Sequence, residues 1–363
     1  MSSWMECKLG EIATYRTGKL NSNAATENGE YPFFTCSPIT AKIDNFAFNE
    51  EALLLAGNNA NGIFSLKYYK GKFNAYQRTY IINTEEDYKF LFYSLKLQLA
   101  NLMHMSQGTA TKFLTLPILN SIDISLPPLE EQKAIAEVLS SLDDKIDLLH
   151  RQNQTLESLA QTLFRQWFIE EAKEEWEEKP LSKIADFLNG LACQKFPPQN
   201  DIEKLPVLKI KDLKDGISEN SDYATSDVKP EYIVNNGDVI FAWSASLMVK
   251  IWDGEQCVLN QHLFKVTSKD FPKWFYYHWC KYHLDNFIAI SSAHATTMGH
   301  IKRGDLDEAM CVIPSNEELV KMDDEISPIF EKIETNSRQI KSLEKMRDTL
   351  VPKLLSGEVR VKN

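Results

Sequence analysis

The side chains in this sequence that could do chemistry are donors and acceptors in polar loops, and the chemistry they suit is contact with phosphates and base edges. Lys, Arg, Thr and Ser donate to phosphate oxygens, whereas Arg, Asn and Gln match the edges of bases. The candidates in the first third of the chain are Arg16, Lys19, Lys70, Lys72, Gln77, Arg78, Thr109, Thr111 and Lys112. Those in the second half are Gln194, Lys195, Lys209, Lys211, Trp243, Ser244, Asn260, Gln261, His262, Thr296, Thr297, His300, Lys302 and Arg303.

One such loop alone indicates no more than a solvated turn, but these loops recur. Moving the loop 106–112 along the sequence by 187 positions places it within the loop 291–299, with Thr109 on Thr296. Because equivalent positions in two similar segments carry the same kind of side chain, a binding role is favoured over chance.

No catalytic constellation accompanies these loops. Gly18-Lys19 lacks the earlier glycine of a phosphate-binding Walker loop, and no G-x-G-x-x-G follows a predicted strand. The Pro-Pro pairs at 127–128 and 197–198 lack the Asn/Asp-Pro-Pro-aromatic tetrad of adenine methyltransferases. The cysteines show no metal-binding spacing, and we expect reduced, mostly buried thiols at Cys7, Cys36, Cys193, Cys257, Cys280 and Cys311. The sequence predicts a non-catalytic protein with no metal and no cofactor of its own.

Charge and composition set further limits. The chain has 363 residues, 43% of them hydrophobic and 25% charged, which is ordinary for two or three globular domains. The formal net charge of −11 argues against a surface coated with phosphate-binding residues, although local basic loops remain possible. Much of the acid lies in the stretch 170–178 and on the two predicted long helices around Asp143, Asp144, Asp323 and Asp324. These acidic surfaces are better suited to solvent or protein than to nucleic acid.

The elements that must position the loops include two long heptad stretches, Glu130–Phe168 and Glu317–Leu355. In each, apolar residues step by alternating threes and fours, the pattern of a coiled-coil seam. The first seam is Ile135, Leu139, Leu142, Ile146, Leu149, Asn153, Leu156, Ala160 and Leu163. The second is Met322, Ile326, Ile329, Ile333, Asn336, Ile340, Leu343, Arg347, Leu350 and Leu354. The same shift of 187 maps one seam onto the other, which indicates an internal duplication.

Two helices of roughly 40 residues would each be about 60 Å long. The economical arrangement packs the two copies against each other, and the alternative is a seam for a partner's helix. A third reading is an ordinary amphipathic helix packed on its own domain. The polar seam residues Asn153, Asn336 and Arg347 are expected to fix the register of the pair.

Before each helix the sequence predicts a mixed domain of short strands and one longer helix. Strands are predicted at 33–35, 51–56, 64–69 and 78–82, and a helix at 88–104. The second domain repeats the plan from Trp176, with strands at 207–211, 238–243 and 258–266, a helix at 274–287 and about 15 inserted residues. The predicted fold class is α+β, with two similar α/β domains separated by two long antiparallel helices. The domains are 1–128 and 173–315, and the helices occupy 129–172 and 316–363.

The start of the chain shows no basic region followed by an apolar run, and no later stretch approaches 18 uninterrupted apolar residues. We therefore expect a cytoplasmic protein.

Several longer motifs resemble those of the specificity (S) subunit of type I restriction-modification systems. The two that flank the helices are Ser125-Leu-Pro-Pro-Leu-Glu-Glu-Gln132 and Leu350-Val-Pro-Lys-Leu-Leu-Ser-Gly-Glu-Val-Arg-Val361. Those in the domains are Lys72–Tyr80, Phe241–Ser246, Leu259–Val266 and Thr296–Ile301. One departure is that the second helix opens with Ile313-Pro-Ser-Asn-Glu-Glu318, without the fuller Pro-Pro motif.

The resemblance implies two target recognition domains, each binding one half of a split DNA sequence, and a helical pair that sets the spacer. It also implies that two methyltransferase (M) subunits, which carry S-adenosylmethionine, dock on this chain. Restriction (R) subunits that use ATP and Mg²⁺ can join. The alternatives from other classes are a coiled-coil scaffold that binds only protein and an enzyme with a cryptic nuclease or methyltransferase centre.

Overall fold

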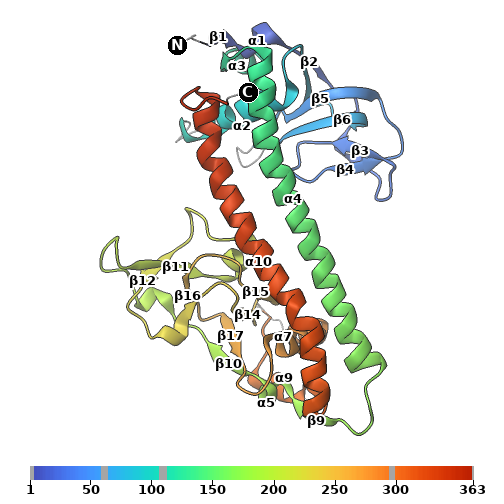
Figure 1. The fold of residues 1–363 in the computed structure, drawn as a ribbon, viewed down its shortest axis with the longest axis vertical. Helices are drawn as coiled ribbons and strands as arrows, with labels where there is room; N and C mark the ends of the chain where they lie inside the picture. The colour runs from blue at the N-terminus through green and yellow to red at the C-terminus, as the bar shows by residue number, and fades with distance from the viewer. Residues whose placement is uncertain (1–3, 59–63, 106–112, 294–298, 362–363) are drawn as a thin grey trace. The chain divides into compact units, whose positions relative to one another are not determined.

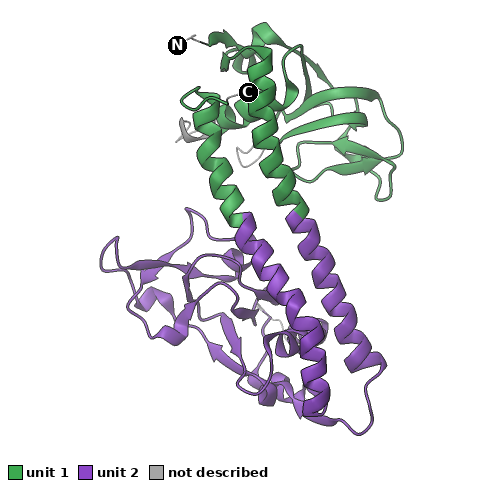
Figure 2. Ribbon diagram, viewed as in Figure 1, with its two compact units in different colours: residues 1–148, 341–363 green, residues 149–340 purple. Residues whose placement is uncertain are grey.

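The chain folds into two compact units that share its two long helices. The computed structural model describes residues 4–58, 64–105, 113–293 and 299–361. One unit consists of residues 1–148 and 341–363, and the other of residues 149–340 (Figure 2). Each unit therefore combines one sheet-containing domain with a part of each long helix. No helix in the described part of the chain is long and apolar enough to cross a membrane.

The two long helices are α4 (Leu129–Arg165) and α10 (Asn316–Leu355) (Figure 1). Each begins just after proline and carries a pair of glutamates in its first turn, where carboxylates complement the positive end of the helix macrodipole. A basic residue stands in the last turn of each, Arg165 and Lys353. A π-helical turn (Gln166–Glu170) continues α4. The prediction of two long helices is confirmed.

Within the unit 149–340 the two helices pack antiparallel around a buried amide pair. Asn336 Nδ2 donates to Asn153 Oδ1 at 2.9 Å, and both side chains are buried. Further along α4, Phe164 stacks on His278 with ring centroids 5.1 Å apart. His278 also meets Phe330, which lies earlier in α10 than Asn336, at 5.7 Å. Residues later in α4 thus face residues earlier in α10, as the predicted antiparallel pair requires.

Within the other unit an ion pair takes the place of the amides. Arg347 Nη1 lies 2.8 Å from Asp143 Oδ1, with about a fifth and a third of the two side chains exposed. The hydroxyl of Tyr93, on α2 (Tyr88–Met105), donates to the other oxygen of Asp143 at 2.7 Å. The polar seam residue Arg347 is therefore paired with an acid on the opposite helix, and a third element is tied to the same carboxylate.

The seam positions predicted from the heptads are all buried or partly buried, whereas the apolar side chains of Leu148, Leu159 and Met346 are exposed. Seam residues also enter the domain cores. Ile135 and Leu139 join the core of the first domain, as Ala160 and Ile326 join that of the second.

The first domain is built on one six-stranded sheet in the order β2-β7-β5-β6-β3-β4. Its strands are β2 (Ala13–Thr17), β3 (Tyr31–Phe34), β4 (Ala41–Ile43), β5 (Phe48–Ala56), β6 (Leu66–Ala75) and β7 (Thr79–Thr84). The central strand β5 is buried from Ala52 to Ala56, consistent with its position between two neighbours. A helical turn, α1 (Leu9–Ile12), precedes the sheet, and α3 (Leu116–Asn120) follows α2.

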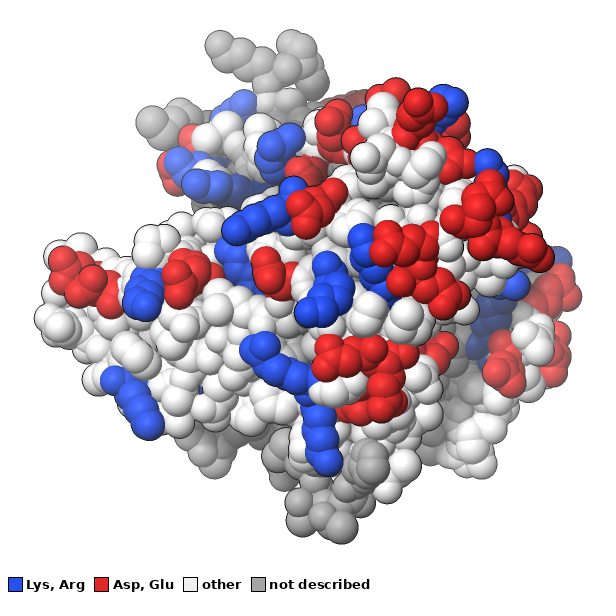
Figure 3. Space-filling model, turned by 90° about the horizontal axis from the view of Figure 1, so that it is seen from below, with Lys and Arg blue, Asp and Glu red and all other residues white. Residues whose placement is uncertain are grey.

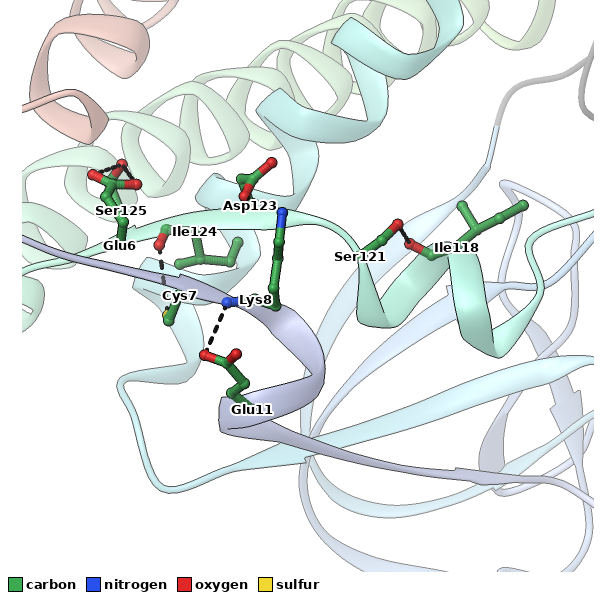
Figure 4. A network of polar contacts seen from close by, with 9 residues as sticks. All are labelled: Glu6, Cys7, Lys8, Glu11, Ile118, Ser121, Asp123, Ile124 and Ser125. Atoms are coloured by element: carbon green, nitrogen blue, oxygen red, sulfur yellow. Dashed lines mark hydrogen bonds and ion pairs between the residues drawn. The ribbon is translucent and has the colours of Figure 1, made fainter.

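A separate two-stranded ribbon joins the beginning and the end of this domain. Strand β1 (Met5–Lys8) pairs antiparallel with β8 (Asp123–Leu126). Figure 4 shows the side chains that support the pair: Lys8 bonds to Asp123, and Ser125 Oγ donates to Glu6 at 2.8 Å. Strand β8 of this ribbon is followed directly by α4.

The second domain has two four-stranded sheets in the orders β10-β17-β14-β15 and β12-β11-β16-β13. The strands of the first are β10 (Asp186–Asn189), β14 (Val239–Ala242), β15 (Met248–Ile251) and β17 (Leu263–Thr267). Those of the second are β11 (Lys204–Leu208), β12 (Tyr223–Thr225), β13 (Ile233–Val234) and β16 (Cys257–Leu259). The ribbon is formed by β9 (Glu177–Pro180) and β18 (Met310–Ile313). The helices are α5 (Leu181–Ile184), α6 (Ile210–Asp215), α7 (Lys273–Tyr282), α8 (Leu284–Ala293) and α9 (Arg303–Glu308).

The two domains follow one plan, which confirms the predicted duplication of the fold. Ribbon β9–β18 corresponds to β1–β8, and the parallel pair β11–β16 corresponds to β3–β6. The indole of Trp4 donates to Glu131 at 3.2 Å, and that of Trp176 donates to Glu318 at 3.0 Å. A basic residue reaches each glutamate as well, Arg360 on Glu131 and Lys173 on Glu318. The first turn of each long helix is therefore held by the same kind of contact, in which a glutamate binds a tryptophan indole and a basic side chain.

Three sequence predictions about the second domain need correction. The strand region predicted at 258–266 is two strands, β16 and β17, which a turn at 260–262 separates. The strand predicted at 207–211 ends at Leu208, because Lys209 caps α6 and Asp212 accepts its backbone N–H. The single helix predicted at 274–287 is two helices, which divide at His283. The insertion places α6 and the segment around β13 where the first domain has the short connections 35–40 and 44–47.

The buried amide pair leads to a stability prediction. Replacing Asn153 alone with Leu removes the nearer acceptor of the buried Asn336 amide, leaving only the longer contact with Gln152 Oε1 at 3.4 Å, and should cost about 1–3 kcal/mol. Replacing both with Leu should recover the loss, because a matched apolar layer has no polar group to desolvate. Urea unfolding midpoints of the full chain measure both effects. Gln161→Leu, at an exposed position of α4, is the control, and a double variant less stable than the single one would contradict the prediction.

Candidate nucleic-acid interface

In the first domain, three loops meet where β5 ends. The N–H of Gly57 donates to the carbonyl of Arg78 at 2.8 Å, and the N–H of Leu114 donates to the carbonyl of Gly57 at 2.8 Å. Asn58 forms an isolated bridge with Phe113. Burial raises the pKa of Tyr80, whose hydroxyl donates to the carbonyl of Leu114 at 2.9 Å. We call this set of contacts the loop junction of the first domain.

The second domain has the same loop junction at equivalent positions. The N–H of Trp243 points to the carbonyl of His262 at 3.4 Å, and the N–H of Ile301 donates to the carbonyl of Trp243 at 3.1 Å. Ser244 forms the isolated bridge, here with His300. Gly57 and Trp243 therefore occupy the same place, as do Arg78 and His262. The backbone is repeated while the side chains differ.

A glycine lets a further segment approach each junction. Leu20 bridges Tyr76 in the first domain, and Leu191 bridges Asn260 in the second. A Cβ on the preceding Gly190 would lie 2.2 Å from the carbonyl oxygen of Asn260. The equivalent Gly18 is still closer to its neighbour, with 1.8 Å from a Cβ to the carbonyl oxygen of Ala75. Only glycine fits so close an approach of two backbones.

The side chains at the junction of the second domain hold one another in place. Ser244 Oγ lies 3.2 Å from Nδ1 of His262, and Gln261 Nε2 lies 3.3 Å from its Nε2. The ring of Trp243 is 5.9 Å from that of His262, and its Nε1 donates to Asn189 Oδ1 at 3.0 Å. Four of the predicted contact residues, far apart in sequence, are brought together here. Such mutual support is what a geometrically selective binding site needs.

Backbone strain marks the same loop. Ala245 follows Ser244 with φ at +57°, in the left-handed region that costs a non-glycine residue roughly 1–2 kcal/mol. The N–H of Ala245 donates to the carbonyl of Gly299 at 2.9 Å. This hydrogen bond holds the turn against the segment that contains His300. Strain of this kind is typical of functional loops.

Beside this junction lies a pocket of about 330 Å³. It is lined in part by three of the predicted contact residues, Gln194, Lys209 and Asn260. Lys209 is paired with Asp222 at its rim. Burial raises the pKa of Cys193 in the wall, so this thiol stays neutral. The pocket adjoins the junction at the buried Asn260, which is next to Gln261 in the chain.

At the junction of the first domain, Gln77 and Arg78 are both exposed. Gln77 Nε2 donates to Asn21 Oδ1 at 2.8 Å, and its N–H donates to the carbonyl of Leu20. Lys19 is exposed beside that bridge. These three predicted contact residues therefore lie close together.

Three other predicted residues of this domain lie elsewhere. Arg16 is bonded to Glu50 at 2.6 Å, and Lys70 to Glu51 at 2.8 Å. Lys72 pairs with the same end of β5 and lies 4.8 Å from the ring of Phe46. Because β5 rises about 3.3 Å per residue, this end is about 20 Å from the junction. A role of Arg16, Lys70 and Lys72 in binding stays a prediction for a separate surface.

The remaining predicted residues border the second junction or lie outside the described chain. Lys195 and Lys211 are exposed, the latter on α6. Lys302 and Arg303 begin α9, and Arg303 donates to the carbonyl of Phe187 at 3.4 Å. The residues that lie outside the described ranges are Thr109, Thr111, Lys112, Thr296 and Thr297.

Three residues of these sites were not predicted from the sequence. Asn58 takes the place of Ser244. The 187-residue shift places Asn58 on Ala245, one position away, so this shift does not identify it. Asn189 accepts the indole hydrogen bond of Trp243, and Cys36 donates to Asn58 Oδ1 at 2.8 Å. No pattern in the sequence indicates these last two contacts, because they join segments that are distant in the chain.

Charge over the surface is mixed. Figure 3 shows basic and acidic side chains interspersed on one face, with acidic ones gathered on its right side and few charges on its left. Among the described residues, no group of three or more His, Cys, Asp or Glu is placed to hold a metal ion.

Comparison with known proteins identifies a family. The protein family described as "Type I restriction modification DNA specificity domain" matches this chain over residues 1–158 and 173–345. The chain is 41% identical over 144 residues to the EcoDI specificity subunit of Escherichia coli, an alignment that covers 38% of this chain and 31% of that protein. It is 30% identical over 304 residues to the MjaIX specificity subunit of Methanocaldococcus jannaschii, covering 76% and 69%.

Two further likenesses extend over nearly the whole chain. The MjaVIII specificity subunit of Methanocaldococcus jannaschii is 26% identical over 409 residues, covering 99% of this chain and 94% of that protein. The crystal structure of a type I restriction-modification S subunit from M. genitalium superposes with a TM-score of 0.64 at 16% identity, covering 97% and 96%. The fold is therefore that of the M. genitalium protein.

The close approach at Gly190 leads to a prediction. Gly190→Ala should lower the free energy of unfolding by roughly 1–3 kcal/mol, because the new methyl group forces two backbone segments apart. Gly304→Ala is the matched control: no atom lies within 4 Å of its Cβ position, and alanine favours the helix α9 by up to about 1 kcal/mol. Urea unfolding compares the two variants with the natural chain. Equal effects at both positions would contradict the tight junction.

Proposed function

The chain belongs to the family of type I restriction-modification DNA specificity subunits, and on that basis we propose that its two domains each read one half of a divided DNA sequence. Residues 1–128 form the first reading domain and residues 173–315 the second. The segments 129–172 and 316–363 form the helical spacer between them. The chain itself carries out no catalysis.

The observation that supports this proposal best is the repeated loop junction. The same backbone contacts present Gln77 and Arg78 in one domain and Gln261 and His262 in the other. A guanidinium offers paired donors that match O6 and N7 of guanine, whereas an imidazole offers a single donor or acceptor at each nitrogen. One scaffold with two different sets of side chains is what the reading of two different half-sites requires.

The helical pair supports a spacer role. The amide pair at Asn153 and Asn336 and the ion pair at Asp143 and Arg347 each hold α4 and α10 in one register. Because seam residues also belong to the domain cores, each reading domain is attached rigidly to its portion of the helices. The number of helical turns then sets the number of base pairs between the half-sites.

The proposal includes the partners of the complex. Two methyltransferase subunits dock on this chain and supply S-adenosylmethionine and the methylation of adenine, and restriction subunits bring ATP and Mg²⁺. The net charge of −11 fits this division of labour, because the partners can provide more of the contact with DNA phosphates. The complex acts in the cytoplasm on double-stranded DNA.

Exchange of one domain tests the division of the target. Replacing residues 1–128 with the first domain of another family member should change one half of the methylated sequence and leave the other half intact. Sequencing of methylated adenines in cells that express the variant with its methyltransferase subunit gives the result. Change in both halves, or in neither, would refute independent reading.

Helix length provides a second test. Inserting one heptad at matching levels of α4 and α10 should lengthen the pair by about 10 Å, equivalent to about three base pairs of DNA. The methylated sequence should keep both halves and gain about three positions between them. Seven residues inserted instead into the connector 171–175 serve as the control and should leave the spacer unchanged. An unchanged spacer in an active complex with longer helices would rule out the spacer role.

A further inference from the structure

Two isoleucines are far more exposed than the other aliphatic side chains on the domain loops. Ile39, between β3 and β4, is 79% exposed, and Ile202, before β11, is 92% exposed. A single exposed aliphatic residue is common on protein surfaces and has no meaning by itself. The surroundings of these two residues differ, and that difference gives Ile39 a role.

The turn that carries Ile39 is fixed by its own side chains. The N–H of Ser37 donates to Thr35 Oγ1 at 3.2 Å, and the N–H of Ile39 donates to Ser37 Oγ at 3.1 Å. Pro38 lies between them and restricts the backbone further. The position of Ile39 is therefore set before any ligand binds, which lowers the entropy lost on binding.

A lysine secures the turn from the sheet side. Lys67 Nζ donates to the carbonyl of Ser37 at 3.1 Å and to Thr40 Oγ1 at 3.0 Å. The ammonium group also lies 5.8 Å from the ring centroid of Phe34, and burial lowers the pKa of Lys67. The group thus braces the turn, and its positive charge lies next to Ile39.

The same turn is attached to the loop junction of the first domain. Cys36 Sγ donates to Asn58 Oδ1 at 2.8 Å and approaches the carbonyl of Arg78 at 3.6 Å. Ile39 is three residues from Cys36, so their Cα atoms are at most about 11 Å apart. A side chain on this turn can therefore reach the same ligand as Gln77 and Arg78.

Local charge separates Ile39 from Ile202. Residues 35–40 contain no acidic side chain. Ile202 also lies on a hydrogen-bonded turn, in which its N–H donates to Asn200 Oδ1 at 2.9 Å, but Asp201 and Glu203 flank it. Two carboxylates repel a phosphate backbone, whereas the turn of Ile39 with Lys67 beneath it attracts one.

We propose that Ile39 contacts the 5-methyl group of a thymine in the major groove, within the half-site read by the first domain. This inference rests on the proposed function and adds an apolar contact to the polar ones at the junction. The thymine methyl is the apolar feature of the major groove, and aliphatic side chains recognise it by direct contact. A fixed, exposed, branched side chain beside polar readers suits that task.

The test combines protein and DNA changes in the complex of the full chain with its methyltransferase subunit. Affinity for the methylated target sequence is measured by fluorescence anisotropy, with each thymine of the first half-site replaced in turn by uracil, which lacks only the methyl group. Ile39→Ala should weaken binding roughly three- to tenfold. At one position uracil should weaken binding by the natural chain to the same extent and cause no further loss with Ile39→Ala.

Ile202→Ala is the matched control and should bind as the natural chain does. The proposal is overturned if Ile39→Ala binds normally, if its loss adds fully to that of uracil at every position, or if the first half-site has no thymine. A rise in 2-aminopurine fluorescence that depends on Ile39 would also overturn it, because it would show insertion between bases. Failure of the natural chain to prefer its target would instead contradict the proposed function.

Discussion

The structure depends on the packing of α4 against α10, because each domain core is built partly from these helices. Phe164 and Ile326 lie in the core of the second domain, and Ile135 and Leu354 lie in that of the first. The helices are therefore structural parts of the domains, and a change in their register would disturb both cores. Polar pairs such as Asn153 with Asn336 lower stability relative to an apolar layer but allow one alignment only. This loss of stability is small compared with the disruption of both domain cores that a shift in helix register would cause.

The backbone of the two loop junctions is the same in both domains, whereas the side chains on it differ. The loop junctions repeat the same hydrogen bonds, and the close approach at Gly18 recurs at Gly190. Arg78 and His262 contribute their backbone carbonyls to this scaffold, and their side chains take no part in its repeated hydrogen bonds. Substitution at these positions can alter recognition with little effect on folding, whereas substitution at the glycines cannot. At Ala245 the backbone adopts a left-handed conformation that is unfavourable for a non-glycine residue. The junction of the second domain therefore includes local backbone strain.

The sequence predicted the long helices, the duplication and the general fold, because heptad spacing and a constant shift between copies are local or regular signals. It did not predict which polar residues lie together. Arg16 and Arg78 looked alike as basic loop residues. The guanidinium of Arg16, however, is bonded to Glu50 near the start of β5, whereas Arg78 lies beside Gly57 after the end of that strand. No short motif predicts such contacts between strands. Lys209 continued an apolar pattern and looked like part of a strand, but it is the N-cap of α6, and Asp212 accepts its backbone N–H. Contacts between distant loops, such as Cys36 with Asn58, depend on the finished fold.

The order in which the chain is made has a consequence for the first domain. Its strands are synthesised first, but its compact unit includes residues 341–363, and the buried Leu354 and Leu355 complete its core. This domain can thus reach its final stability only after the end of α10 has been translated. Until then, the apolar surfaces of Leu95 and Ile135, which belong to this core, lack part of their cover. A premature stop near the end of α10 would therefore damage the first domain, although none of its strands would be missing.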